Sequence, residues 1–253
     1  MTGPACSYWL EQAEGDVPAG DQWLSAGERS HLRSLRFVKR RRDWRLGRWT
    51  AKRALASCLA LKGDRHSLED IEIRALPSGA PEVHLFCQRA NVSISLSHRA
   101  GLGLCVVSLS GASLGCDLEL LELREDSFVT DFFTADEQQL VKRAPAYEQP
   151  LLATLIWSAK ESALKALKVG LRLPTASLEV GFTAGLPGPG EYTGHEDREF
   201  WSPLSVRCRG GRVLHGWWRC ANDVMRTVVF NTLQAGWHSD RGSIWPRRIS
   251  EAS

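Results

Sequence analysis

Two carboxylates stand two positions apart in the segment LGCDLELLE, residues 114–122. If this segment is a strand, Asp117 and Glu119 point to one face and their immediate neighbours to the other. Two adjacent carboxylates repel each other unless a cation lies between them, and hard oxygen ligands suit Mg²⁺. The alternative is an ordinary half-exposed strand with its acids in water. Alone, so short a pattern favours the second interpretation, because it often matches by chance.

A second pair of charged residues lies in LIWSAKESALKALKVG, residues 155–170, which has the periodicity of a helix. Trp157, Glu161 and Lys165 follow one another along one side of that helix. A glutamate four residues before a lysine is the favoured order for a solvent-exposed ion pair, which needs no ligand. If this face instead lines a cleft opposite the Asp-x-Glu pair, Glu161 completes a three-carboxylate metal site and Lys165 reaches a phosphate.

Ser97 and His98 end the alternating segment VSISLSH, residues 92–98. A hydroxyl group and an imidazole at the end of a strand can both donate to phosphate oxygens. A surface turn in which the two side chains satisfy only local backbone groups explains the same residues.

The segment from Arg29 to Arg53 holds eleven Lys or Arg residues and one acid, Asp43, although the net charge of the chain is only +3. Guanidinium groups bind phosphate in a bidentate manner, so this cluster fits a small phosphorylated ligand. It also fits a nucleic acid bound by residues 29–53, with tryptophans available to stack on bases. A solvated amphipathic helix is the third interpretation.

The segment GASLG, residues 111–115, matches the G-x-S-x-G nucleophile elbow of serine hydrolases, with Asp197 and His215 downstream of Ser113. That motif requires a strand, a sharp turn and then a helix. Here the following residues alternate as a strand, so the context disagrees with a serine hydrolase.

The elements that would position these residues follow the order helix, strands, helices, strands. We predict a helix over residues 26–62 that ends at Gly63-Asp64, and a capping box at Thr134 and Glu137 that opens a second helical region. Three strands joined by short turns favour an antiparallel set: they are 92–98, 102–110 and 113–122. The other predicted elements are a strand at 71–76, a turn at 77–81, a helix at 151–170 that stops at Gly170, strands at 177–182 and 204–208, and a hairpin of 214–220 and 224–230 that turns at Asn222-Asp223.

This order predicts an α+β fold of two similar halves, residues 1–112 and 113–253, with the active site between them and a boundary near 111–126. No sequence repeat is evident to support the duplication. The tail from about residue 238 is expected to be loosely held.

The composition narrows the class of protein. At 253 residues, with ordinary apolar and charged fractions, the chain can form one large or two compact globular units. No apolar run approaches the roughly 20 residues of a membrane-spanning helix, and no signal peptide is expected. Seven scattered cysteines without C-x-x-C spacing fit free thiols in a reducing cytoplasm better than disulfides or zinc.

Four of the segments occur in one order along the chain. Together they are a more specific signal than any one of them alone. SISLSHRAG, LGCDLELLE, FFTADE and WSAKESALKAL resemble the motifs of the 4′-phosphopantetheinyl transferase superfamily, in its larger, Sfp-type branch. The resemblance covers residues 35–182 and includes GRWTAKRAL and the PSGAP turn. It implies a pseudo-dimer of two α+β halves with coenzyme A bound between them.

The activity that the resemblance implies is transfer of the 4′-phosphopantetheine arm of coenzyme A to a serine of an apo acyl or peptidyl carrier protein. The reaction would depend on Mg²⁺ and release 3′,5′-ADP. The implied partner is the carrier protein, in place of nucleic acid or a membrane, and a chain of two halves is expected to act as a cytoplasmic monomer.

The resemblance places Mg²⁺ on the pyrophosphate of coenzyme A, held by Asp117, Glu119 and Glu161. The carrier serine must lose a proton as it attacks phosphorus, and Glu161 would accept that proton directly or through a metal-bound water. A hydroxide on the metal is the alternative base, because Mg²⁺ lowers the basicity of a carboxylate that binds it. Asp117, Glu161 and Lys165 are therefore the expected catalytic residues.

Other residues would bind coenzyme A. Ser97, His98 and Lys165 would contact its phosphates, and the basic helix would meet its 3′-phosphate. The candidates in that helix are Lys39, Arg42 and Arg48. The family turn is usually G-K-P or G-R-P, whereas residues 79–81 are Gly-Ala-Pro, so Arg74 or the basic helix would replace the missing cation.

Overall fold

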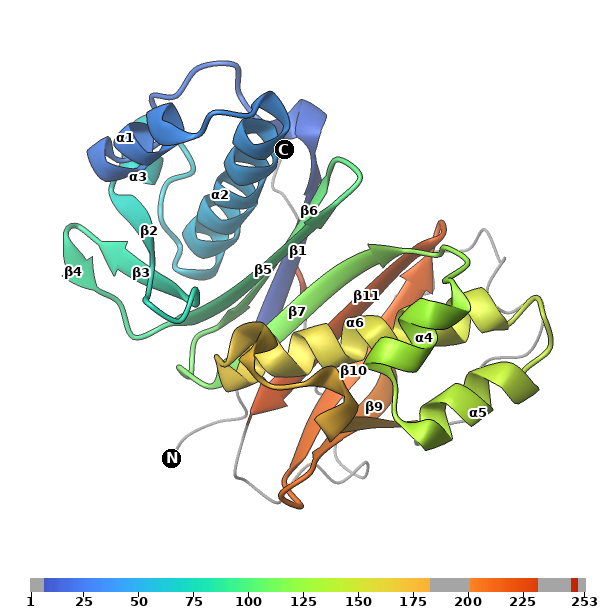
Figure 1. Ribbon diagram of the computed structural model, residues 1–253. Coiled ribbons are helices and arrows are strands. Elements are labelled where there is room, and N and C mark those ends of the chain that lie inside the picture. The colour runs from blue at the N-terminus through green and yellow to red at the C-terminus, as the bar shows by residue number, and fades with distance from the viewer. Residues whose placement is uncertain (1–6, 183–200, 232–246, 250–253) are drawn as a thin grey trace. The chain divides into compact units, whose positions relative to one another are not determined.

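The computed structural model describes residues 7–182, 201–231 and 247–249 (Figure 1). The chain divides into an N-terminal unit, Met1–Leu114 with Gln234–Ser253, and a C-terminal unit, Gly115–Leu233. Each unit combines helices with a mainly antiparallel sheet, so the predicted mixed α+β class is confirmed. Within the described ranges, no helix is long and apolar enough to cross a membrane, and the cysteines are free thiols.

The N-terminal unit packs one long helix on a sheet. Its elements in chain order are β1 (Ser7–Ala13), α1 (Ala26–Ser34), α2 (Val38–Cys58), α3 (Arg65–Glu69), β2 (Ile71–Ala75), β3 (Pro81–Leu85), β4 (Gln88–Arg89), β5 (Ser93–Arg99), β6 (Leu102–Ser108) and β12 (Arg247–Arg248). The strand orders are β12-β1-β6-β5 and β2-β3-β4. Helix α2 lies against β1, β5 and β6, as Figure 1 shows, and buries Ala51 and Leu55 in the core.

The C-terminal unit has the same kind of core. Its elements are β7 (Ser113–Leu120), α4 (Asp126–Phe132), α5 (Ala135–Arg143), α6 (Gln149–Leu167), β8 (Leu178–Phe182), β9 (Ser202–Cys208), β10 (Val213–Ala221) and β11 (Val224–Asn231). The strands form one sheet in the order β7-β11-β10-β9-β8. Helix α6 crosses a face of this sheet (Figure 1) and buries Leu155 and Ile156 against Val229.

Most predicted elements are present. Strands β2, β5, β6, β8, β9, β10 and β11 and helices α5 and α6 lie close to their predicted bounds. Strands β10 and β11 turn at Asn222 and Asp223, whose φ angles of 52° and 57° are typical of the predicted two-residue hairpin turn. Thr134 and Glu137 form the predicted capping box.

The single long helix predicted over residues 26–62 is wrong. The segment forms two helices, α1 and α2, because the backbone is extended at Leu35 and at Phe37. Leu35 is buried in the core, so the extended link fixes the end of α1 while α2 takes its own direction on the sheet. Helical periodicity on both sides of the link concealed the break.

The predicted ends of the two long helices are also displaced. Helix α2 ends before Gly63, because Ala60 adopts a left-handed conformation with a φ of 53°. Helix α6 ends before Gly170 in the same way, at Lys168 with a φ of 58°. Glycine usually fills this position because it has no Cβ to strain, so the nearest glycine misled the prediction by a few residues.

One strand prediction needs correction, and some elements were not predicted. Strands β5 and β6 pair antiparallel as expected, but β7 pairs with β11 instead of joining them. Strand β1 and helix α4 were not predicted. Strand β12 pairs with β1 and Ile249 is buried, in contrast to the loosely held tail expected there; the rest of that tail lies outside the described residues.

The two units share a local arrangement of helices. In each, a short helix (α1 or α5) directly precedes the long helix (α2 or α6), and antiparallel strands follow along the chain. The short helix opens with a capping box whose glutamate is buried and pairs with a buried lysine of the long helix. The Glu28–Lys52 distance is 2.6 Å, and the Glu137–Lys160 distance is 2.5 Å.

Both buried pairs are satisfied in the same way. The other oxygen of each glutamate accepts a strand N–H, from Ile73 at 3.1 Å and from Val180 at 2.9 Å. Each lysine also donates to two backbone carbonyls. Lys52 ends the segment WTAK and Lys160 ends the segment WSAK, so the two buried lysines lie in similar short segments.

We expect Lys160→Met to lower the free energy of unfolding by about 3–5 kcal/mol, because it leaves the buried Glu137 carboxylate without its cation. Urea unfolding measures this loss. The control is Lys142→Met on the exposed face of α5, which should change stability by less than about 0.5 kcal/mol. Equal stability of the two variants would contradict a structural role for Lys160.

Candidate active site

Strand β7 and helix α6 meet at a distance that only glycine allows. A Cβ added at Gly115 would lie 1.9 Å from the Ser162 carbonyl oxygen and 2.6 Å from the Ala166 nitrogen. Because side chains two apart on a strand share a face, Asp117 and Glu119 also point toward α6. The glycine of the G-x-D-x-E motif therefore sets how closely the carboxylates approach the helix.

Asp117 is held by a lysine from α6. Lys165 Nζ donates to Asp117 Oδ1 at 2.8 Å and to the Cys116 carbonyl at 2.8 Å. Asp117 is 5% exposed, so water contributes little to stabilising its charge. Burial is the largest single effect and would lower the pKa of Lys165, but its neighbours, Asp117 first and Glu161 among them, together raise that pKa. The lysine is therefore a fixed positive charge.

Glu161 lies one turn before Lys165 and is less well satisfied. Its Oε1 is buried and accepts no hydrogen bond from any described residue. Burial raises the pKa of Glu161, and the charges of Asp117 and Glu119 raise it further against the opposing effect of Lys165. A carboxylate in this position is typical of a functional site, where a cation or a proton completes it.

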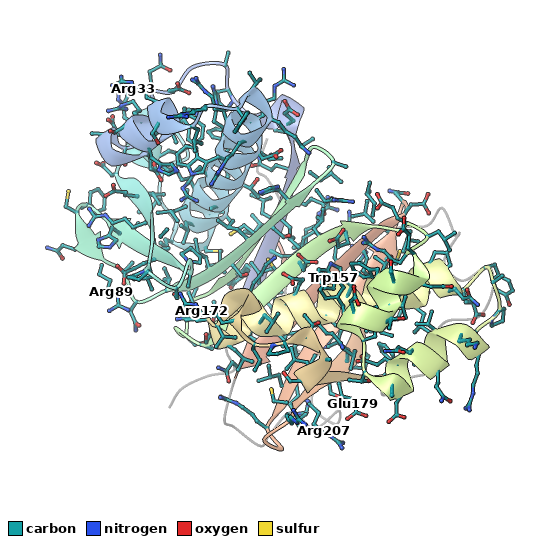
Figure 2. The ribbon with its side chains drawn as sticks, in the orientation of Figure 1. Arg33, Arg89, Trp157, Arg172, Glu179 and Arg207 are labelled. Atoms are coloured by element: carbon teal, nitrogen blue, oxygen red, sulfur yellow. The ribbon has the colours of Figure 1, made fainter. Side chains whose placement is uncertain are left out.

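Glu119 is engaged by two donors. Trp157 Nε1–H, from the α6 tryptophan labelled in Figure 2, donates to Glu119 Oε1 at 3.1 Å. Arg124 Nη2 donates to Glu119 Oε2 at 3.3 Å. The side of α6 that carries Trp157, Glu161 and Lys165 therefore packs against the carboxylates of β7 and is not a solvent-exposed ion-pair face.

The acids supply ligands of the right type for Mg²⁺. Hard carboxylate oxygens suit this ion, which is commonly held by one or two carboxylates together with phosphates of the substrate. Asp117 and Glu161 fit such a pair, and the unsatisfied Oε1 of Glu161 fits a cation. Within the described ranges, no group of three or more acidic, histidine or cysteine side chains is arranged to hold a metal.

The Ser-His pair lies in the N-terminal unit. Ser97, half-buried, and His98, exposed, are near the end of β5, as predicted from the alternation. The chain then turns at Ala100 and Gly101, whose φ angles are 49° and 77°. Both side chains are thus placed at a strand end.

The predicted coenzyme A residues of the basic segment differ in exposure. Lys39 is exposed, and the exposed Arg42 lies 3.4 Å from Glu14. Arg48 is largely buried, with its guanidinium 3.6 Å from Glu28. Burial lowers the pKa of Arg48 against the effect of Glu28. Only part of the segment is therefore available to an external phosphate.

Two further residues bear on the phosphate and nucleic-acid interpretations. Arg74, the suggested substitute at the Gly-Ala-Pro turn, forms an exposed ion pair with Glu72 at 2.6 Å. Trp49 is 9% exposed and packs edge-on against Trp23 with ring centroids 5.2 Å apart. A buried ring cannot stack on a base, so Trp49 does not favour nucleic-acid binding.

Ser113 does not lie on a nucleophile elbow. It is the first residue of strand β7, so it begins a strand and does not lie at a turn from a strand into a helix. Of the suggested partners, His215 is exposed on β10 and Asp197 lies outside the described residues. The strand context expected from the sequence is confirmed.

Sequence reasoning missed two features of the site. Arg124, from the link between β7 and α4, had no motif to mark it. Lys160 was quoted only within the W-x-x-K-E motif, and Glu137 only within FFTADE and as a capping-box residue, but the two form the buried pair described above. The similarity of the WTAK and WSAK segments could have identified that structural role.

Gly115→Ala is expected to destabilise the protein by about 1–3 kcal/mol or more, because the added Cβ collides with the backbone of α6. The matched control is Gly47→Ala inside α2, where a Cβ meets nothing and alanine should add about 0.5–1 kcal/mol. Urea unfolding compares them. If the free energy of unfolding of Gly115→Ala equals that of the wild type, α6 and β7 are not in contact as described.

Glu161→Gln is expected to be at least as stable as the wild type at pH 7. Since the folded state raises the pKa of Glu161 above 4.5, ionisation of this carboxyl lowers the free energy of unfolding as pH rises through the raised value. Glutamine does not ionise and carries no such cost. The free energy of unfolding of the variant, measured in urea, should therefore rise relative to that of the wild type between pH 5 and pH 7. A surface ion pair would give the opposite sign, a small loss in the variant.

Residues 113–210 match the family model of the 4′-phosphopantetheinyl transferase superfamily. No curated protein matches the chain significantly. Asp117, Glu119, Glu161 and Lys165 all fall within the matched residues. The site of the C-terminal unit is therefore carried by a stretch that is similar to this superfamily of transferases.

Proposed function

We propose that this protein transfers the 4′-phosphopantetheine arm of coenzyme A to a serine of an apo acyl or peptidyl carrier protein and releases 3′,5′-ADP. The observation that carries the proposal is the Asp117–Lys165–Glu161 cluster between β7 and α6, within the residues that match the superfamily. Acids and a fixed cation in one desolvated place suit phosphoryl transfer, which is catalysed mainly by positioning and charge.

Each residue has a distinct task in this reaction. The serine oxygen of the carrier forms a bond to phosphorus while the bond from phosphorus to the leaving 3′,5′-ADP breaks. Lys165 stays protonated beside Asp117, so it can stabilise negative charge on the phosphate oxygens. Glu161 can accept the serine proton, since its raised pKa lies closer to neutral pH than that of an ordinary carboxylate.

The proposal includes Mg²⁺ as the metal. Asp117 and Glu161 would hold it, with Glu119 as the third acid of the motif. When bound, the ion supplies Lewis-acid stabilisation of the pyrophosphate oxygens. Lys165 would then orient Asp117 by donating a hydrogen bond to its Oδ1.

Residues of the N-terminal unit complete the proposal. Ser97 and His98 would contact the phosphates of coenzyme A, and the 3′-phosphate would be bound by Lys39, Arg42, Arg48 or Arg74. Of these, Lys39 is exposed to solvent and can reach a ligand directly. Arg48 would have to exchange its contact with Glu28 for the ligand. The two units would form the pseudo-dimer of the Sfp-type branch, and the enzyme would act as a cytoplasmic monomer.

Incubation with coenzyme A, Mg²⁺ and an apo carrier protein should add one phosphopantetheine arm to the carrier, measured by intact-protein mass spectrometry. A panel of acyl and peptidyl carriers identifies the pathway that the enzyme serves. Chelation of Mg²⁺ should stop the reaction. No mass gain with any carrier, under conditions where a known transferase modifies the same panel, would refute the proposal.

Glu161→Gln and Asp117→Ala should each lower the rate of transfer by about a hundredfold or more, because each removes charge that acts in the transition state. Circular dichroism and unfolding measurements establish that the variants remain folded. The control is Glu179→Gln, which changes an exposed carboxylate on β8 (Figure 2) and should keep full activity. Full activity in Glu161→Gln would remove this residue from the site.

A further inference from the structure

One carboxylate of the proposed metal site is already bound on both oxygens. Glu119 accepts a hydrogen bond from Trp157 on Oε1 and one from Arg124 on Oε2. The contact with Arg124 is charge-assisted, and both side chains of this ion pair are largely buried, at 14% and 15% exposure. Water and salt therefore screen the pair much less than they screen a surface pair.

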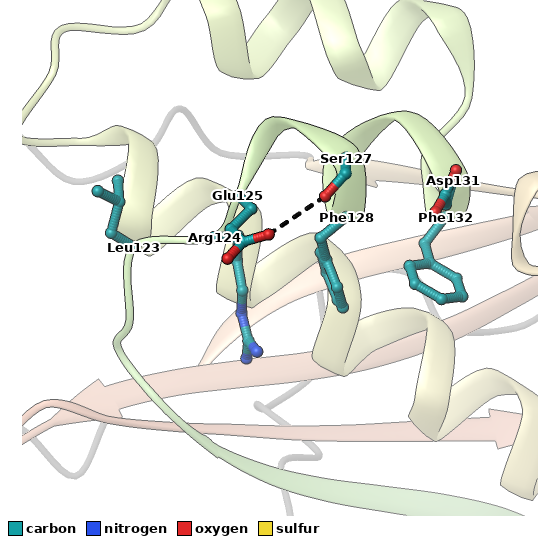
Figure 3. Close-up of a pocket in the computed structure, with 7 residues that line it drawn as sticks. All are labelled: Leu123, Arg124, Glu125, Ser127, Phe128, Asp131 and Phe132. Carbon is teal, nitrogen blue, oxygen red and sulfur yellow. Dashed lines mark hydrogen bonds between the residues drawn. The ribbon is translucent and has the colours of Figure 1, made fainter.

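The two donors are themselves held by an aromatic cluster. The Arg124 guanidinium lies 5.0 Å from the ring centroid of Phe128, and Phe128 lies 4.9 Å from the ring of Trp157. Phe132 packs on the same tryptophan at 5.1 Å. Figure 3 shows Arg124, Phe128 and Phe132 extending to one side of α4 and the link before it. This packing keeps both donors directed at Glu119.

The other two acids differ from Glu119 in a way that matters for metal binding. The Glu161 Oε1 is buried and accepts no hydrogen bond from the described residues, and the lysine that donates to Asp117 Oδ1 also donates to the Cys116 carbonyl. Mg²⁺ needs only one or two carboxylates when phosphates provide its other ligands. The lack of a three-acid metal group in the described ranges agrees with this difference.

We infer that Arg124 is a positioning residue that, together with Trp157, holds Glu119 outside the metal ligand set. The protein ligands of Mg²⁺ are then Asp117 and Glu161, and Glu119 orients the Trp157 ring and the start of α4. This inference rests on the proposed function, because the metal is the one used in phosphopantetheine transfer.

Mn²⁺ binding to the full chain in saturating coenzyme A, followed by electron paramagnetic resonance, tests the inference. Glu161→Gln removes a ligand and should weaken Mn²⁺ binding by about a hundredfold, whereas Glu119→Gln should weaken it by less than about tenfold. Arg124→Met keeps a long side chain over Phe128 but releases Glu119, and should tighten Mn²⁺ binding by about tenfold as a third carboxylate becomes available. Thermal unfolding confirms that each variant is folded.

Two further variants separate this inference from simpler effects. Arg124→Met also removes a positive charge, which alone would favour a cation. The double variant Arg124→Met/Glu119→Gln should therefore lose the tighter binding, and Arg124→Lys, which retains the ion pair, should bind Mn²⁺ as the wild type does. If the double variant still binds Mn²⁺ more tightly than the wild type, loss of the positive charge alone explains the effect, and the inference is overturned.

The outcome also distinguishes this inference from the proposed function. Loss of Mn²⁺ affinity in Glu119→Gln as large as in Glu161→Gln, with transfer intact in the wild type, overturns the inference alone. The expected Mn²⁺ pattern without transfer to any carrier supports the ligand assignment and overturns the proposed function. A wild-type protein that binds no Mn²⁺ overturns the inference as well.

Discussion

The contact between the backbone of α6 and strand β7 is the constraint on which the site depends. Gly115 provides it, since any side chain there would meet the Ser162 carbonyl at 1.9 Å. The same contact partly removes Asp117 and Glu161 from water. Charges interact more strongly in the protein interior than in water. Burial then raises the pKa of Glu161, and Lys165 keeps its proton because Asp117 lies beside it. Backbone packing and site electrostatics thus have a common cause.

The buried glutamate–lysine pairs explain why neighbouring residues of one motif face different surroundings. Successive residues on a helix differ in direction by about 100°, so Lys160 faces Glu137 in the core while Glu161 faces the β7 carboxylates. The WTAK segment of α2 retains the buried lysine, Lys52, but Arg53 follows it in place of a glutamate. The buried glutamate–lysine pair is therefore common to both units, and the acidic cluster around Glu161 belongs to the C-terminal unit.

The sequence predicted what depends on alternation, helical period and local turns. Strand alternation placed Asp117 and Glu119 on one face, and helical spacing placed Trp157, Glu161 and Lys165 on one side of α6. It did not predict that β7 pairs with β11, because strand partners distant in the chain leave no local signal. Nor did it predict Arg124, whose contact with Glu119 depends on the path of the link before α4.

Several independent contacts fix the helix that carries Glu161. They allow the fold to hold the partly buried charge of this carboxylate. Helix α6 is fixed to β7 at Gly115, to the start of α5 through Lys160, and to β11 through hydrogen bonds of Ser158 and Ser162 with Thr227 at 2.9 and 2.7 Å. Such anchors resist the rotation that would carry a half-buried carboxylate into water. A carboxylate kept partly desolvated in this way retains a high affinity for a cation or a proton, because either one removes the cost of its burial. Packing along the rest of α6 thus offsets the cost of keeping the Glu161 carboxylate partly desolvated.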